Sequence, residues 1–168
     1  ELVEGQFNDV IDDTDVDVDD VRRLVFCSGK IYYDLLARKT ELGARDIALI
    51  RIEQLHPFPT GSVDRIIRKY KNTLLTLWVQ EEPGNMGPWR HIQQEFRNTE
   101  IMPVYRQPSG SPAAGLVRLH QISQEEILGK VFRRCECELK RKYCGLQCAN
   151  GSNRQHILQQ YSYFPENS

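Results

Sequence analysis

Residues 74–79 read LLTLWV, a short and nearly continuous apolar run. Such a run is typical of a strand that is buried on both faces of a sheet. Gln80, Glu81 and Glu82 follow at once, and PGNMG at residues 83–87 favours a turn. The stretch therefore predicts a buried strand that ends in a polar turn, which would serve as an acid–base centre, a binding loop or a solvated turn.

The rest of the chain repeats this pattern of apolar runs separated by helical spacing. Further apolar runs are RRLVFC, DIALIRI and IMPVYR, at residues 22–27, 46–52 and 101–106. Helical spacing of apolar residues marks 31–43, 63–70, 89–96 and 123–131. This alternation predicts an α/β fold, a mostly parallel sheet with helices on both faces. Pro103 places the last strand at an edge of the sheet.

Local signals mark the ends of these helices. Gly43 suits a helix C-cap, and Pro88 suits the first position of the helix that follows it. Ser123 with Glu126 forms a capping box, which predicts that the last helix begins there.

The 168 residues are about one domain's worth, and 40% are hydrophobic. No apolar run approaches the length of a membrane span, and no signal-peptide pattern is present. We therefore expect no membrane partner and a cytoplasmic location. The chain begins at Glu1 without an initiator Met, so we expect an excised domain or a fragment.

Charge is distributed unevenly along the chain. Residues 1–20 hold nine acids and no Lys or Arg, which predicts a flexible acidic linker. The segment lacks the Gly and the terminal Glu of an EF-hand calcium loop. The remainder carries 22 basic and 14 acidic residues, but it lacks the interleaved aromatic residues of single-strand binders. We expect no nucleic-acid partner.

The cysteines divide the rest of the chain. An α/β domain is expected at 21–134, a Cys-rich knuckle at 135–150 and a tail at 151–168. The knuckle has the spacing C-x-C-x₆-C-x₃-C, formed by Cys135, Cys137, Cys144 and Cys148. Four thiolates predict a structural zinc site; an iron–sulfur cluster and reduced or disulfide-bonded thiols are the alternatives. Cys27 ends an apolar run and is expected to be a buried thiol.

In a parallel sheet, ligands bind outside the carboxyl ends of the strands. The residues expected there as an effector or phosphate site are Ser28, Gly29, Lys30, Arg51 and Arg106. Arg106 is the strongest candidate, because a guanidinium holds phosphate or carboxylate with two hydrogen bonds. The alternative is an interdomain salt bridge from Arg106 to Glu53 or Glu82.

The loop after residue 79 is expected to dock on a partner domain or subunit. Its candidate interface residues are Gln80, Glu81, Glu82 and Asn85. Side chains of adjacent residues diverge, whereas paired acid–base catalysis needs convergent carboxylates. No catalytic residue is therefore predicted.

Several of these stretches together resemble one family. The stretches are CSGKIYYDLL (27–36), ARDIALIRIEQLHPFP (44–59), LWVQEEPGNMGPW (77–89) and YRQPSGSPAAG (105–115) with LHQ (119–121). In this order they resemble the C-terminal domain of the thiamine-diphosphate-dependent first component of 2-oxoglutarate dehydrogenase, of bacterial type. The resemblance implies a transketolase C-terminal-like fold.

The resemblance also implies a division of labour. Thiamine diphosphate and Mg²⁺ would be held by preceding domains, so the isolated chain is expected to be inactive. The whole homodimeric enzyme would decarboxylate 2-oxoglutarate and pass the succinyl group to a lipoyl domain of the dihydrolipoyl succinyltransferase component. The domain itself would support packing and, in some members, a site for AMP or acetyl-CoA.

Two departures from the family pattern affect these expectations. Tyr105 stands where the family often has Gly before the Arg, which argues against close approach of a phosphate to the backbone. NMGPW, in place of NQGAW, resembles the 2-oxoadipate relative. The alternatives to an enzyme domain are a nucleotide-binding regulatory module and an interaction domain without a small ligand.

Overall fold

The computed structural model describes residues 7–97, 99–110 and 117–132. Its elements follow the alternation of strands and helices that the sequence predicts. In chain order they are β1 (Val10–Ile11), β2 (Arg23–Cys27), α1 (Ile31–Leu42), β3 (Ile47–Ile52), α2 (Thr60–Lys69), β4 (Leu75–Pro83), α3 (Trp89–Glu95), β5 (Met102–Arg106) and α4 (Val117–Phe132).

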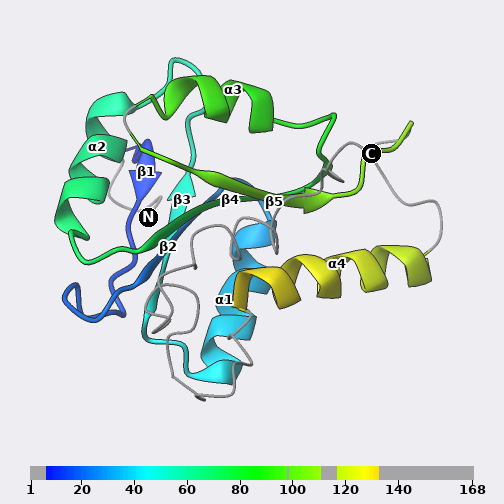
Figure 1. Cartoon of the computed structure of the whole chain (residues 1–168), viewed down its shortest axis with the longest axis horizontal. Helices are drawn as coiled ribbons and strands as arrows, with labels where there is room; N and C mark the ends of the chain where they lie inside the picture. The colour runs from blue at the N-terminus through cyan, green and yellow to red at the C-terminus, as the bar shows by residue number, and fades with distance from the viewer. Residues whose placement is uncertain (1–6, 98, 111–116, 133–168) are drawn as a thin grey trace, which may run out of the picture.

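The strands form one sheet in the order β1-β3-β2-β4-β5 (Figure 1). β3, β2, β4 and β5 run parallel to one another, and β1 runs antiparallel to β3. The predicted α/β fold with a mostly parallel sheet is confirmed. The strand that contains Pro103 lies at an edge, as predicted.

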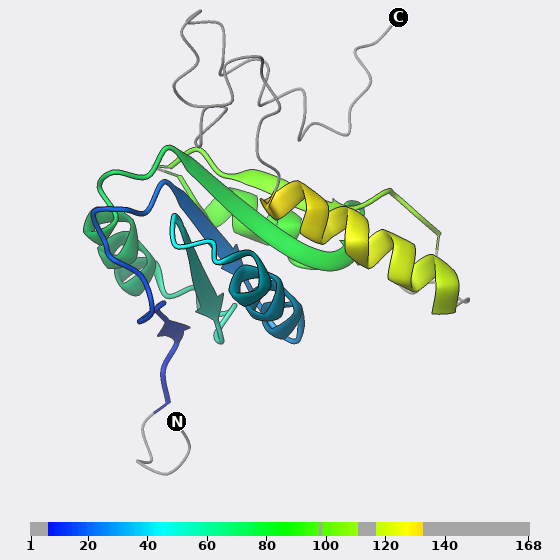
Figure 2. The same cartoon turned by 90° about the horizontal axis from the view of Figure 1, so that it is seen from below.

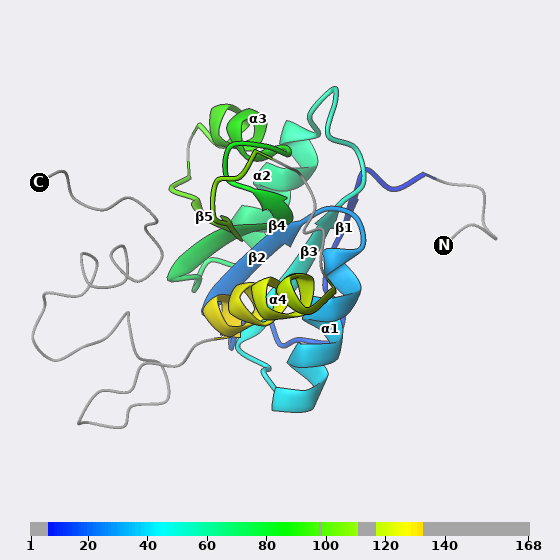
Figure 3. The same cartoon turned by 90° about the vertical axis from the view of Figure 1, so that its right-hand side faces the viewer.

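Helices cover both faces of the sheet. α1 and α4 lie on one face, and α2 and α3 lie on the other (Figure 3). The view from below shows α1 and α4 side by side against the sheet (Figure 2). Alternate residues of β2 enter the two cores, with Val25 and Cys27 on one side and Leu24 and Phe26 on the other. Cys27 is the buried thiol that the sequence predicts, and burial raises its pKa to about 12.

The ends of two elements differ from the sequence-based prediction. β4 does not stop at residue 79 but continues to Pro83, because Gly84 N–H donates to Arg106 O at 3.0 Å and keeps the strand beside β5. α4 begins at Val117, so Ser123 lies inside the helix and the predicted capping box is wrong. The spacing of Ser and Glu at i and i+3 places them on one helical face in an interior turn as well. Gly43 does end α1, with φ 57°.

The acidic segment also differs from the expected flexible linker in its described part. Asp13 Oδ2 lies 2.5 Å from Lys39 Nζ and accepts a hydrogen bond from Leu49 N–H at 2.9 Å. Asp12 accepts hydrogen bonds from Lys69 Nζ and from the Tyr70 hydroxyl, at 2.5 and 2.8 Å. These carboxylates neutralise lysines of α1 and α2, and β1 covers the edge of β3.

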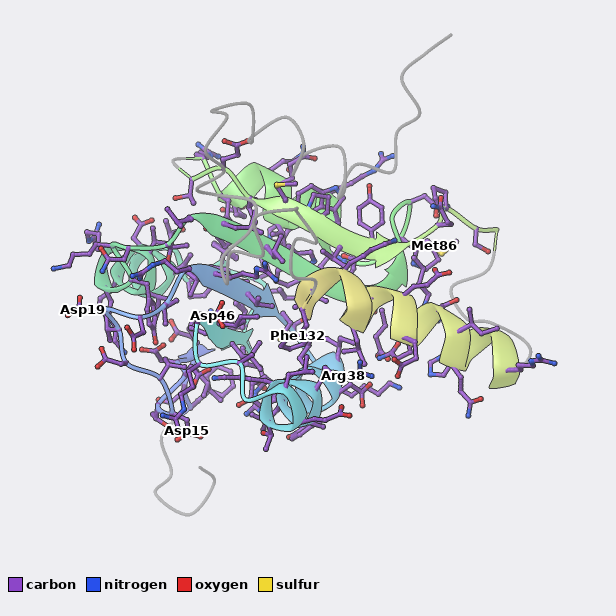
Figure 4. The ribbon with its side chains drawn as sticks, turned by 60° about the horizontal axis from the view of Figure 1, so that its bottom comes forward. Asp15, Asp19, Arg38, Asp46, Met86 and Phe132 are labelled. Atoms are coloured by element: carbon purple, nitrogen blue, oxygen red, sulfur yellow. The ribbon has the colours of Figure 1, made fainter. Side chains whose placement is uncertain are left out.

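Other acidic residues of this segment face the solvent. Asp15 and Asp19, labelled in Figure 4, are exposed. Among the described residues, no helix is both long enough and apolar enough to cross a bilayer.

Replacing Asp13 by Ala should lower the free energy of unfolding by about 3 kcal/mol, because it leaves the Lys39 ammonium buried without its carboxylate. Urea denaturation followed by tryptophan fluorescence measures this loss. Asp15→Ala is the matched control in the same segment and should change stability by less than about 0.5 kcal/mol. Equal stability of the two variants would show that the Asp13–Lys39 pair does not anchor the segment.

Candidate functional site: the carboxyl edge of the sheet

Parallel pairing brings the carboxyl ends of β3, β2, β4 and β5 to one edge of the sheet. The chain runs from β2 to β3 on one side and then crosses to β4 on the other side of β2. Ligands in open parallel sheets bind at such a change of direction. The predicted site residues are distributed along this edge, and the structure joins them into two separate groups.

The first group begins with Lys30, at the start of α1, and Glu81, near the end of β4. Lys30 Nζ lies 3.1 Å from Glu81 Oε1, and their side chains are 68% and 19% exposed. Ser28 and Gly29 form the turn between β2 and α1, where Gly29 has φ 70°. The Lys30 ammonium is thus close to the helix start, as predicted, but it is already paired with a carboxylate.

Gln124 of α4 connects this pair to Arg106. Its side-chain amide donates to Glu81 Oε1 at 3.2 Å and to Asp34 Oδ2 at 2.7 Å. Its carbonyl oxygen, Oε1, accepts a hydrogen bond from Arg106 Nη2 at 3.0 Å. One amide therefore joins β4, β5, α1 and α4.

Arg106 has neutral partners where the sequence suggested a carboxylate. Its Nη2 bonds to Gln124 and also to His120 Nδ1, at 3.0 Å. Its Nε is buried and has no hydrogen-bond partner in the described part of the chain. Glu53, one of the two carboxylates considered as the alternative partner of Arg106, pairs with Arg51 instead.

The second group surrounds Arg51, on the far side of β2 from β4. Arg51 Nε lies 2.6 Å from Glu53 Oε1, and its guanidinium stacks on Tyr32 at 4.7 Å from the ring centroid. Its Nη1 donates to the Tyr33 hydroxyl at 3.4 Å. These neighbours differ from those of Lys30 and Arg106, so the predicted five-residue effector set is divided.

Gln80 has a structural role in the candidate interface loop. Only 2% of it is exposed. Its Oε1 accepts from the Trp78 indole N–H at 3.0 Å, and its Nε2 donates to Met86 O at 2.8 Å. Gln80 thus accepts the hydrogen bond of the buried Trp78 indole and also holds the loop after β4. Met86, labelled in Figure 4, belongs to this loop.

Asn85 and Glu82 are the more accessible members of this loop. Asn85 is exposed and exchanges two hydrogen bonds with the backbone of Ser109, at 2.9 and 3.1 Å. Glu82 is half-buried. The loop after β4 is therefore tied to the loop after β5. Its role as a docking surface stays a prediction.

Tyr105 does not obstruct Arg106. Its side chain belongs to the core on the α2–α3 face, where its ring lies 6.4 Å from the ring of Trp89. Arg106 contacts α4 on the opposite face, since neighbouring strand residues point to opposite sides. The aromatic ring packs so close to Gly84 that a Cβ there would lie 2.4 Å from it. Tyr105 fills space in the core on the α2–α3 face and does not occupy the side on which Arg106 meets α4.

A groove lies between α1 and α4 beside the first group of residues. Its volume is about 650 Å³. Its lining residues are Lys30, Asp34, Ala37, Arg38, Glu41, His120, Gln121, Gln124, Glu125 and Leu128. Arg38, labelled in Figure 4, reaches across from α1 and bonds both carboxylate oxygens of Glu125 on α4, at 2.9 and 2.7 Å.

Sequence reasoning missed Gln124 and Asp34 and gave His120 no specific partner. His120 and Gln124 are four residues apart, so a helix that begins upstream of both would have placed them on one face. The predicted metal ligands Cys135, Cys137, Cys144 and Cys148 lie outside the described residues.

Residues 1–132 match the family model described as 2-oxoglutarate dehydrogenase C-terminal, which covers most of the 168 residues. The chain belongs to this family. The resemblance carried by the motifs is thereby confirmed.

Proteins similar to this chain come from animals and bacteria. The 2-oxoadipate dehydrogenase complex component E1 of Rattus norvegicus is 44% identical over 131 residues, which are 75% of this chain and 14% of the relative. The 2-oxoglutarate dehydrogenase E1 component of Azotobacter vinelandii is 39% identical over 141 residues, 79% of this chain and 15% of the relative. The chain spans about one seventh of the length of these relatives.

Replacing Gly87 by Ala should destabilise the domain by about 2 kcal/mol, and Gly29→Ala by about 1 kcal/mol. Both glycines have positive φ, 69° and 70°, so both substitutions add backbone strain. Only at Gly87 would the new Cβ also lie 2.8 Å from Gln80 Nε2, while the space at Gly29 is open. Urea denaturation of the two variants measures the difference. A Gly87→Ala variant as stable as Gly29→Ala would contradict a close fit between Gln80 and the loop.

Proposed function

We propose that this chain is the C-terminal domain of a thiamine-diphosphate-dependent 2-oxoacid dehydrogenase. The match of residues 1–132 to the 2-oxoglutarate dehydrogenase C-terminal family carries the proposal. The whole enzyme would decarboxylate 2-oxoglutarate in the cytoplasm and transfer the succinyl group to a lipoyl domain of the dihydrolipoyl succinyltransferase component. 2-Oxoadipate is the alternative substrate, because relatives named for each substrate are 39% and 44% identical to this chain.

In this proposal the thiamine diphosphate and Mg²⁺ are bound by other domains of the enzyme. Within residues 7–97, 99–110 and 117–132, no three His, Cys, Asp or Glu side chains gather where they could hold a metal ion. The four tail cysteines as a structural zinc site stay a separate prediction.

The role we propose for the domain is to pack against the preceding domains and to support a homodimer. β1 is antiparallel to β3, with Val10 opposite Ile52, and Glu53 N–H donates to Asp9 O at 2.9 Å. Residues just before β1 thus lie at the carboxyl edge of the sheet, beside the second group of site residues. The loop with Glu82 and Asn85 is at the same edge. Both features support docking of the preceding domains there.

The proposed enzyme role predicts activity for a chimera in which residues 1–132 replace the matching region of the Azotobacter vinelandii E1 component. Reconstituted with its partner components, the chimera should form NADH from 2-oxoglutarate within about tenfold of the parent rate, because the catalytic domains are unchanged. The same assay with 2-oxoadipate compares the two substrates. The isolated 168-residue chain is the control and should show no turnover. A folded chimera that is inactive with both 2-oxoacids would contradict the proposal.

A second candidate function, binding of an anionic effector, is favoured by one specific observation. The buried Arg106 Nε has no hydrogen-bond partner among the described residues, and the partners of Nη2 are neutral. A guanidinium in this state can still gain a phosphate or carboxylate. Lys30 offers a second cation at the same edge.

Titration of the chain with AMP or acetyl-CoA, followed by Trp78 and Trp89 fluorescence, should give saturable binding. Arg106→Ala should weaken this binding at least tenfold, because it removes the proposed bidentate contact. Arg65→Ala, an exposed substitution on α2, is the control for loss of one positive charge and should bind like the wild type. Binding that is unchanged in Arg106→Ala would place the effector elsewhere and favour a purely structural domain.

A further inference from the structure

His120 and Gln124 stand between the α1–α4 groove and Arg106. Both line the groove, together with Lys30 and Asp34. Arg106 is not a lining residue, although its Nη2 is bonded to both of them. A ligand in the groove therefore meets His120 and Gln124 before it meets the guanidinium.

The hydrogen bonds fix how these two side chains are oriented. Arginine has only donors, so His120 Nδ1 must accept, and the neutral ring carries its proton on Nε2. For the same reason Gln124 turns its oxygen to Arg106 and its NH₂ group to Asp34 and Glu81. The amide also separates Arg106 from these two carboxylates.

This arrangement leaves Arg106 with weaker partners than it can have. Hydrogen bonds to an ionised acceptor are about twice as strong as those to a neutral one, and a bidentate oxyanion engages two nitrogens at once. An incoming oxyanion can also reach the buried Nε, which lacks a hydrogen-bond partner within the described part of the chain. Arg106 therefore gains when its hydrogen bonds to His120 and Gln124 are replaced by hydrogen bonds to an oxyanion.

The two halves of α4 differ in how they are held. The second half is anchored in the core by Ile127, Leu128, Val131 and Phe132. In the first half, none of the side chains described at positions 118 and 120–126 is buried. Among the described side chains of that half, His120, Gln124 and Glu125 make polar contacts with Arg106, Asp34, Glu81 and Arg38. The described residues of α4 that belong to the core all lie in its second half, so His120 and Gln124 are not among them.

We propose that His120 and Gln124 form a gate that a phosphate-bearing ligand in the α1–α4 groove displaces to bind Arg106, with Lys30 as the second cation. The proposal rests on the effector function proposed above and adds how that site is closed. The groove, at about 650 Å³, falls within the size range of small-molecule pockets. Without ligand, the first half of α4 covers Arg106.

The gate is tested by AMP titrations of the 168-residue chain and its variants by calorimetry. His120→Ala removes one of the two groups that compete with the ligand, without touching Asp34 or Glu81. It should bind AMP about tenfold more tightly than the wild type, a change of about 1.4 kcal/mol. Ile122→Ala, an exposed substitution on the same helix, is the matched control and should bind like the wild type. His120→Ala combined with Arg106→Ala should lose the gain.

Two further measurements test whether the phosphate of AMP displaces His120. Adenosine lacks the phosphate and should bind the wild type and His120→Ala equally. In the free chain, ¹⁵N NMR should show His120 Nδ1 as an unprotonated acceptor, and AMP should shift that signal. Loss of the Arg106 contact is the reason for the shift.

The possible results distinguish the gate from the effector site itself. Equal AMP affinity in the wild type and His120→Ala, abolished by Arg106→Ala, would refute the gate and leave the Arg106 site intact. Failure of His120→Ala to bind AMP, in a variant that unfolds like the wild type, would refute both. A gain that survives Arg106→Ala would also refute the gate, because the ligand would then bind another group.

Discussion

Burial of β2 and β4 on both faces is the constraint on which the rest of the structure depends. The buried side chains of both strands are apolar apart from Thr76 and Gln80, and the charged groups of β4 appear only towards its end. The Trp78 indole shows the consequence most clearly, because its buried N–H needs an acceptor. Gln80 supplies that acceptor and, through Met86, shapes the following loop. The sequence QEEP thus begins with a residue that the core requires and continues with residues that face the edge.

Buried cations, like the buried indole of Trp78, need partners inside the protein. The ammonium of Lys39 is almost inaccessible, and the carboxylate of Asp13 reaches it from a segment far away in the sequence. Arg106 is held instead by an imidazole and an amide. Breaking a buried ion pair leaves an uncompensated charge, whereas neutral partners can be exchanged at lower cost. The Lys39 pair is therefore suited to permanent attachment, and the Arg106 contacts are suited to exchange.

Sequence reasoning was most successful where local pattern and burial coincide. The four longer strands, the edge position of β5 and the C-cap at Gly43 follow from apolar runs, Pro103 and backbone freedom. It failed where distant residues decide the outcome. A segment rich in Asp resembles a flexible linker until Lys39 is placed beside Asp13.

The candidate site was only partly predictable for the same reason. Lys30 and Arg106 were identified because strand ends meet in a parallel sheet. Gln124, which connects them, comes from a helix whose start was misplaced by six residues, from Val117 to Ser123. Arg51 was grouped with them by its position at a strand end, but its carboxylate and aromatic neighbours hold it in a separate group.

Helix α1 contacts both α4 and the acidic segment that contains Asp13. On one side Asp34 and Arg38 contact Gln124 and Glu125 of α4. Lys39, the residue after Arg38, holds Asp13 and thereby the segment that follows β1. A helix as short as α1 moves as a unit. A change in the contacts between α4 and α1 therefore also acts on the Lys39–Asp13 pair. The groove and the segment that follows β1 are therefore both in contact with α1. A ligand that displaces the first half of α4 would therefore also act, through α1, on the Lys39–Asp13 pair and the segment that it holds.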